Sequence, residues 1–167
     1  MTPFPSVADS LYLDPGCYSI TVQMFVTDDD SGSSTSTKNF TGLDFYQAAF
    51  QAPIKEDERN IAKYGNVVPV KVDLRSMCFP GTSVTNRTLH ITIVSGDQTE
   101  NDIVGDELIA VSVSNADVGT QMRVAGGGYL YNLSTRDMVK DKLYTIRIRD
   151  GSSTGPIILR ALFLPKK

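Results

Sequence analysis

Three observations predict an all-β fold, a two-layered sandwich of short strands. Apolar and polar residues alternate at every second position in several stretches, a pattern that places one face of each strand in a core and the other in water. Candidate helical segments are scarce and too short to be stable by themselves. Turn-forming residues separate the alternating stretches at a spacing of roughly ten residues, as is typical of sandwiches.

The alternating stretches give the expected strands in chain order. They are residues 18–26, 68–74, 89–93, 129–133 and 144–149. Residues 157–164 form a continuous apolar run, which indicates a strand buried on both faces or a closing strand with an apolar edge. Turn signals lie between the strands, among them Pro80-Gly81, Gly126-Gly127-Gly128 and Asp150-Gly151.

The chain of 167 residues suits one domain of ordinary size or two small ones. Residues 1–46 hold three strands at most, residues 47–64 are polar and indicate a linker, and residues 65–167 suffice for a sandwich domain. A sheet as small as that of residues 1–46 buries too little surface to fold alone. We therefore expect it to pack on the larger domain, to pair with another chain, or to be the remnant of a longer domain.

The composition argues against several classes of protein. The 16 basic and 19 acidic residues give a formal net charge of −3, without the basic excess that is typical of a nucleic-acid-binding protein. No apolar run approaches about 18 residues, so we expect no membrane-spanning helix. The first residues, MTPFP, lack the charged start and apolar core of a signal peptide. If the protein is secreted, we expect this chain to be a mature fragment.

Two parts of the sequence resemble known modules of extracellular proteins. Residues 16–32, GCYSITVQMFVTDDDSG, resemble the C-terminal half of a PKD (polycystic kidney disease) repeat, whose typical pattern is G-x-Y-x-V-x-L-x-V-x-D-x-x-G. Three patches resemble the PxKF module and occur in the order typical of that family: VPVKV, YLYNLST and YTIRI. Val72 stands where that family has Phe, and Arg136 stands where Lys is common.

The resemblance implies an immunoglobulin-like antiparallel β-sandwich, with a partial PKD-like segment in residues 1–46 and a PxKF-like domain in residues 65–167. Both families consist chiefly of non-catalytic modules, and the PxKF module is found at the ends of secreted multidomain bacterial proteins. The missing first half of the PKD-like repeat implies a fragment or a variant with a trimmed front. We therefore expect a structural spacer or adhesive module, extracellular or at the cell surface, whose partners are neighbouring modules of the parent protein.

Two other functions stay open. A carbohydrate-binding accessory module of a secreted hydrolase would stack a polysaccharide or cell-surface glycan on Tyr129 and Tyr131, which share one face of a strand, with Tyr64 or Tyr144 as further candidates. Core or edge packing is the commoner fate of such a pair, and the chain has no Trp. A self-assembling subunit would pair the strands of residues 1–46 with a sheet edge of another copy, forming a homo-oligomer.

The sequence contains no recognisable catalytic constellation, so we expect no enzyme. His90, the single histidine, lies on the polar side of its strand and is expected to be exposed. Asp28, Asp29 and Asp30 precede a glycine and could bind calcium, the one cofactor considered. A solvated turn, whose side chains bond to the local backbone, is the favoured interpretation of this loop.

Cys17 and Cys78 are the only cysteines. Two free, half-buried thiols are the favoured interpretation. A disulfide between them is the alternative, which would suit an exported protein.

Overall fold

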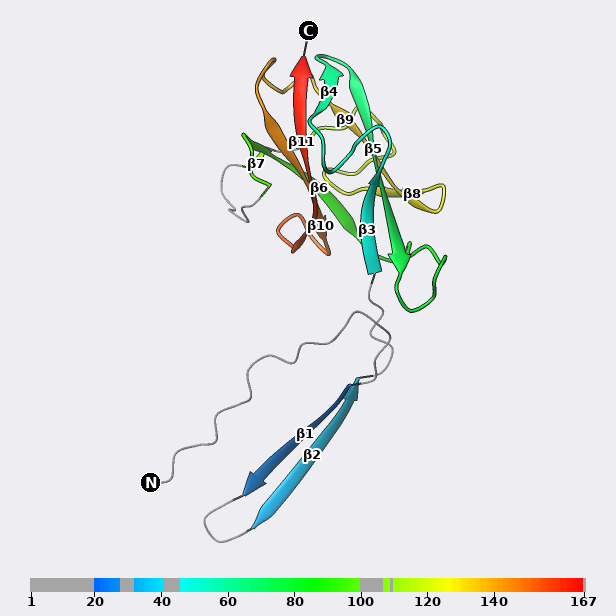
Figure 1. Cartoon of the computed structure of the whole chain (residues 1–167), viewed down its shortest axis with the longest axis vertical. Coiled ribbons are helices and arrows are strands. Elements are labelled where there is room, and N and C mark those ends of the chain that lie inside the picture. Colours follow the sequence, from blue (N-terminus) through cyan, green and yellow to red (C-terminus); the bar gives the residue numbers. More distant parts are fainter. Residues whose placement is uncertain (1–19, 28–31, 41–45, 100–106, 109, 167) are drawn as a thin grey trace, which may run out of the picture. The chain divides into compact units, whose positions relative to one another are not determined.

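The structure is a computed structural model that describes residues 20–27, 32–40, 46–99, 107–108 and 110–166 (Figure 1). All the regular elements in these residues are strands, so the predicted all-β class is confirmed. The described residues contain no helix that could cross a membrane. The chain divides into two compact units. Residues 1–45 with 77–80 form the hairpin unit, and residues 46–76 with 81–167 form the sandwich unit.

The hairpin unit contains a two-stranded antiparallel sheet. β1 (Ile20–Thr27) pairs with β2 (Ser33–Phe40) in an unbroken register that runs from Ile20 opposite Phe40 to Thr27 opposite Ser33. Successive residues of each strand point to opposite faces of this sheet.

The sandwich unit contains two sheets (Figure 1). The four-stranded sheet has the order β3-β5-β9-β8, formed by Tyr46–Gln51, Val67–Ser76, Gly128–Ser134 and Arg123–Ala125. The five-stranded sheet has the order β4-β11-β10-β6-β7, formed by Asn60–Lys63, Ile157–Lys166, Tyr144–Asp150, Leu89–Ser95 and Glu107–Leu108. Neighbouring strands are antiparallel, except that β4 runs parallel to β11.

The core lies between these two sheets and follows from the alternation. On β5 every second residue from Val68 to Leu74 is buried. The other sheet contributes alternate residues of β6 and β10 and, from β11, Ala161 and Phe163. Burying a Val, Leu, Ile or Phe side chain stabilises a fold by roughly 1.5–3 kcal/mol. The central strand β10 is buried at every position, so its outward-facing side chains are covered too.

The prediction that residues 47–64 form a linker is wrong, because both ends of this segment are strands. Its first part belongs to β3 and its last part to β4, and these strands lie in different sheets. Ala48 and Phe50 pack against the core, which a linker would not do. Only the polar run between the two strands connects them, and it includes a cis peptide bond before Pro53. The assignment of PKD-like and PxKF-like domains stays a prediction.

Candidate functional site

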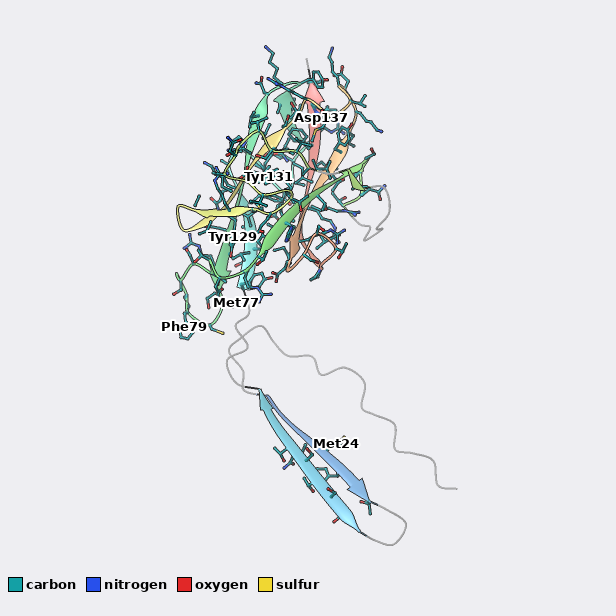
Figure 2. The ribbon with its side chains drawn as sticks, turned by 180° about the vertical axis from the view of Figure 1, so that it is seen from behind. Met24, Met77, Phe79, Tyr129, Tyr131 and Asp137 are labelled. Atoms are coloured by element: carbon teal, nitrogen blue, oxygen red, sulfur yellow. The ribbon has the colours of Figure 1, made fainter. Side chains whose placement is uncertain are left out.

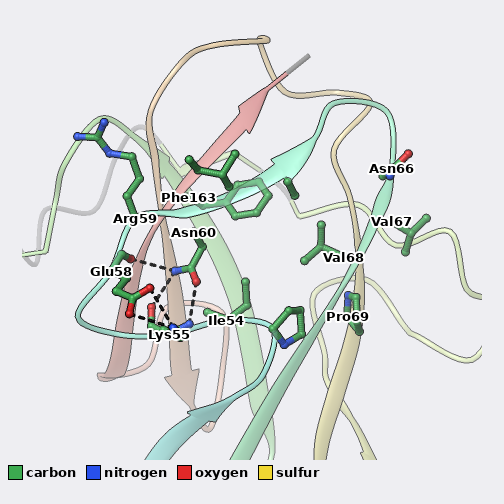
Figure 3. A pocket seen from close by; sticks show the side chains of 13 residues that line it. Ile54, Lys55, Glu58, Arg59, Asn60, Asn66, Val67, Val68, Pro69 and Phe163 are labelled. Atoms are coloured by element: carbon green, nitrogen blue, oxygen red, sulfur yellow. Dashed lines mark hydrogen bonds and ion pairs between the residues drawn. The ribbon is translucent and has the colours of Figure 1, made fainter.

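A groove opens where the chain crosses from one sheet to the other (Figure 3). Its volume is about 330 Å³, and it is lined by the β3–β4 connection, β4 and the beginning of β5. Ile54 is buried and anchors the connection, while Phe163 of β11 lines the groove from the core side. We call this feature the crossover groove.

Asn60, the first residue of β4, holds the crossover together. Its Oδ1 accepts a hydrogen bond from the Lys55 backbone N–H at 2.8 Å, and its Nδ2 donates to the Lys55 carbonyl at 2.7 Å. Nδ2 also donates to the carbonyl of Leu162 at 2.9 Å and to that of Glu58 at 3.2 Å. One buried amide therefore closes the connecting loop and attaches it to β11.

The polar groups of the crossover groove are hydrogen-bond donors and acceptors. Lys55 forms an exposed ion pair with Glu58 at 2.9 Å, and Arg59 and Asn66 complete the polar lining. The lining residues include no hydroxyl, thiol or imidazole group. This donor set can form hydrogen bonds with a chain segment, and the Lys55 amine, its one candidate nucleophile of that kind, is held in the ion pair with Glu58.

A second cluster joins the two sheets at the other end of the sandwich unit. Asp150, at the end of β10, is buried and accepts hydrogen bonds from the Tyr46 hydroxyl and from Arg87 Nη2, both at 2.5 Å. Burial raises the pKa of Asp150, but the bonds from Arg87 and Tyr46 outweigh it and hold the pKa below its usual 3.8. Burial, followed by the bond to Asp150, raises the pKa of Tyr46 to about 12.

Asp117 organises the segment that precedes β8. Its carboxylate is 0% exposed, accepts from Ser112 Oγ at 2.5 Å and from the Asn132 N–H at 3.0 Å, and pairs with Arg123. Burial alone raises the pKa of Asp117, but the hydrogen bonds and the Arg123 charge reverse this effect and lower it. The carboxylate is therefore a charged structural group at neutral pH.

The predicted sugar-stacking role of Tyr129 and Tyr131 is wrong, because both side chains lie in the core (Figure 2). Tyr129 is 2% exposed and Tyr131 is 0% exposed. The Tyr129 hydroxyl donates to the Arg87 carbonyl at 3.0 Å, and the Tyr131 hydroxyl lies 2.9 Å and 2.8 Å from the carbonyl oxygens of Ala110 and Gly119. Neither ring face is available to a glycan.

The other two candidate tyrosines also have structural contacts. Tyr144 is buried at the beginning of β10, and its hydroxyl accepts from the Val139 N–H at 2.7 Å. Tyr64 is 39% exposed, and its hydroxyl donates to the Arg136 carbonyl at 3.0 Å. The carbohydrate-binding alternative thus retains a single partly exposed ring among the four candidates.

His90 is half-buried rather than exposed. Its Nδ1 lies 3.0 Å from Thr120 Oγ1, and burial lowers the pKa of its imidazole. The contact attaches β6 to the segment before β8, which gives the histidine a structural role.

Three predicted site residues and one predicted disulfide partner cannot be placed. Asp28, Asp29 and Asp30 lie outside the described residues, so the calcium site stays a prediction. Elsewhere in the described part of the chain, no group of three or more His, Cys, Asp or Glu residues could hold a metal ion. Cys78 is disulfide-bonded rather than free. Its expected partner, Cys17, also lies outside the described residues, and their pairing stays a prediction.

No protein-family model matches the chain. Comparison with curated proteins and with solved structures gives no significant match either. The PKD-like and PxKF-like resemblance therefore rests on the quoted residues alone.

The structural roles of Asn60 and Asp117 could not be recognised from the sequence. Asn60 ends a polar run that is typical of a connector, and its acceptor on Leu162 lies 102 positions away. Asp117 follows a stretch rich in Ser and Val, and Asn132, whose backbone N–H donates to its carboxylate, lies 15 positions away.

Proposed function

We propose that the sandwich unit is a non-catalytic module with immunoglobulin-like topology, which acts as a mechanical spacer in an extracellular or cell-surface protein. Three features support this proposal: the order of the strands, the contact of Tyr144, and the positions at which the chain enters and leaves the unit. The third feature carries it.

The strand order supports the immunoglobulin-like topology. Lettered in chain order, β3 and β4 correspond to the divided first strand A and A′, and β5 to B. The strands β6, β7, β8, β9, β10 and β11 then correspond to C, C′, D, E, F and G. The four-stranded sheet becomes A-B-E-D and the five-stranded sheet becomes A′-G-F-C-C′. Immunoglobulin domains have these ABED and GFC sheets.

A tyrosine contact supports the same topology. In immunoglobulin-like sandwiches, a tyrosine near the start of strand F bonds through its hydroxyl to the backbone a few residues upstream, a motif called the tyrosine corner. Tyr144 begins β10, the strand that corresponds to F, and its hydroxyl accepts from the N–H of Val139.

The chain enters and leaves the sandwich unit at opposite ends (Figure 1). Tyr46, the first residue of β3, contacts Asp150 at the end of β10, where β11 begins. Lys166 ends β11 at the far side, beyond the pair formed by Tyr144 and Phe163. Ten residues of β11 span about 33 Å at about 3.3 Å per residue. A module with this geometry transmits tension along its length and separates its neighbours by that length.

The parallel pair of β4 and β11 suits this task. Tension between Tyr46 and Lys166 draws β4 toward one end of the unit and β11 toward the other, so the hydrogen bonds between them are loaded together rather than one after another. The Tyr64 N–H donates to the Lys166 carbonyl at 2.6 Å, and Asn60 reaches Leu162. Both ends of β4 are therefore attached to β11.

The disulfide at Cys78 supports the proposed location. Disulfides persist in oxidising compartments and are rare where glutathione and thioredoxin keep thiols reduced. An exported chain would keep this bond.

Single-molecule stretching tests the proposal. The chain is pulled through handles attached upstream of Tyr46 and after Lys166, and separately through handles at Tyr46 and Ser152, which lie at the same end. We expect a higher unfolding force for the first geometry, and we expect Asn60→Ala to lower that force while Glu58→Gln, which changes only an exposed ion pair, leaves it unchanged. Equal forces in the two geometries would contradict the proposal.

A further inference from the structure

The hairpin of β1 and β2 lacks what a sheet needs for stability. It is a two-stranded sheet, and within the described residues neither strand has a second neighbour. An isolated two-stranded hairpin is at best marginally stable in water, and a third strand or a packed face is needed. A third strand or a packed face would therefore stabilise the hairpin.

Neither face of the hairpin is covered at the middle of β1. Met24 is 60% exposed and Phe25 is 70% exposed. Consecutive residues of a strand point to opposite faces, so one of these side chains is exposed on each face of the sheet (Figure 2 labels Met24). Among the described residues, packing at the middle of β1 therefore adds little stability, which draws attention to the edges of the sheet.

The sequence of β1 gives its outer edge none of the usual protection against pairing. Its eight residues, ITVQMFVT, include no charged residue, no proline and no glycine. Natural proteins usually protect an exposed edge strand with lysine, proline or a bulge, and an unprotected edge is a template for another strand. The pairing with β2 shows no bulge along its whole length. β2 differs, because Lys38 lies on it.

We propose that β1 is a self-association edge, which pairs antiparallel with β1 of a second copy of this chain. The assembly is a continuous four-stranded sheet in the order β2-β1-β1-β2. A second copy fits this edge because an antiparallel pair of identical strands has two-fold symmetry, the commonest symmetry of homo-oligomers. Since β1 carries no charge, no like charges meet across the pair at any register. A sheet needs about three strands to be stable by itself, and the four strands of the dimer exceed this number whereas the hairpin alone does not reach it.

The proposal is independent of the spacer function, because it concerns only the hairpin unit. A failure of the stretching experiment on the sandwich unit would leave it intact, and the reverse also holds.

Sedimentation equilibrium of the full chain across a wide concentration range tests the proposal. Gln23 and Thr37 are cross-strand partners and both are exposed, so lysine at either position places the same charge on the same face of the hairpin. We expect the native chain to dimerise with increasing concentration. Gln23→Lys brings like charges together near the centre of the new pair and should weaken the dimer by about twofold to fivefold. Thr37→Lys lies on the far strand and should change it much less.

Hydrogen exchange keeps the test decisive if Gln23→Lys disturbs the hairpin itself. The amides of β1 in the native chain should exchange more slowly as the dimer forms, while those of β11 should not change. A native chain that stays monomeric at every concentration would overturn the proposal. Equal weakening by the two lysine variants, or a dimer without slower exchange in β1, would do the same.

Discussion

Buried carboxylates act as structural hubs in this protein. Asp117 and Asp150 each accept several hydrogen bonds and each pairs with an arginine. A buried charge is costly unless it is paired and hydrogen-bonded, so each hub stabilises the fold only while all its partners are present. The bond from the Tyr46 hydroxyl to Asp150 joins strands β3 and β10 of the two sheets.

Substitution of Asp117 should be among the most destabilising single changes in the sandwich unit. Asp117→Asn keeps the shape but removes the charge that Arg123 faces, and we expect it to lower the free energy of unfolding by about 3–5 kcal/mol. Asp73→Asn is a matched control, because the Asp73–Arg75 pair is more exposed and should contribute less than about 1 kcal/mol. Urea denaturation measures both. Similar losses in the two variants would show that the burial of Asp117 has no energetic role.

The Tyr46–Asp150 contact predicts a specific pH dependence. Because the folded pKa of Tyr46 is raised from 10 to about 12, its contribution to stability is fully present below pH 10 and is lost as the pH rises toward 12. The Asp150 pKa is lowered instead, so its contribution is lost as the pH falls below 3.8. We expect the difference in unfolding free energy between the native chain and Tyr46→Phe to shrink between pH 10 and 12. A difference that stays constant across that interval would refute this assignment.

At the scale of elements, the crossover determines how the first part of the sandwich unit is distributed between the two sheets. β3 pairs with β5 from Tyr46 opposite Ser76 to Gln51 opposite Lys71, and then the chain leaves that sheet. The loop closed by Asn60 delivers β4 to β11. A four-residue strand has few backbone hydrogen bonds of its own, and the Asn60 side chain adds to them at the beginning of β4.

Loss of the Asn60 amide should detach β4 without unfolding the sandwich unit. In Asn60→Ala, the Tyr64 N–H, which donates to the Lys166 carbonyl, should exchange with solvent deuterium faster than in the native chain. The Val84 N–H, which donates to the Leu74 carbonyl, should keep its rate. The global cost should be about 1–3 kcal/mol, because the backbone partners of the amide lose their bonds. Equal acceleration at both amides would mean global rather than local opening.

At the scale of the whole molecule, the division into two units has a thermodynamic consequence. We expect calorimetry to resolve two transitions, one for each unit. Self-association at β1 stabilises only the hairpin unit, so the midpoint of its transition should rise with protein concentration while that of the sandwich unit stays fixed. A single transition would show that the two units unfold together.

The sequence predicted strands best where one face meets the core. The alternation in β5, β6, β9 and β10 is visible locally and was confirmed. β3 and β4 were missed because β4 is short and its pairing partner, with Asn60 opposite Phe163, is distant in the chain. A polar run next to a short strand cannot be distinguished from a linker without that partner.

The stacking prediction for Tyr129 and Tyr131 was wrong for a related reason. Alternation showed that Tyr129 and Tyr131 share a face, but it did not show which face is buried. That is determined by the register with β5, which sets Tyr129 opposite Val72 and Tyr131 opposite Val70, two residues of the core. Side-chain hubs such as Asp117 depend on contacts across the chain and were beyond local patterns.

The place of β11 in its sheet has a consequence for biosynthesis. β11 is the last strand in the sequence, yet it lies between β10 and β4. During translation β4 therefore emerges about a hundred residues before its sheet neighbour, and the five-stranded sheet cannot close until β11 has left the ribosome. Synthesis that stops before β11, or cleavage just before it, would remove an interior strand rather than an edge. Loss of this one strand would leave the backbone groups of both β10 and β4 without their partner on β11.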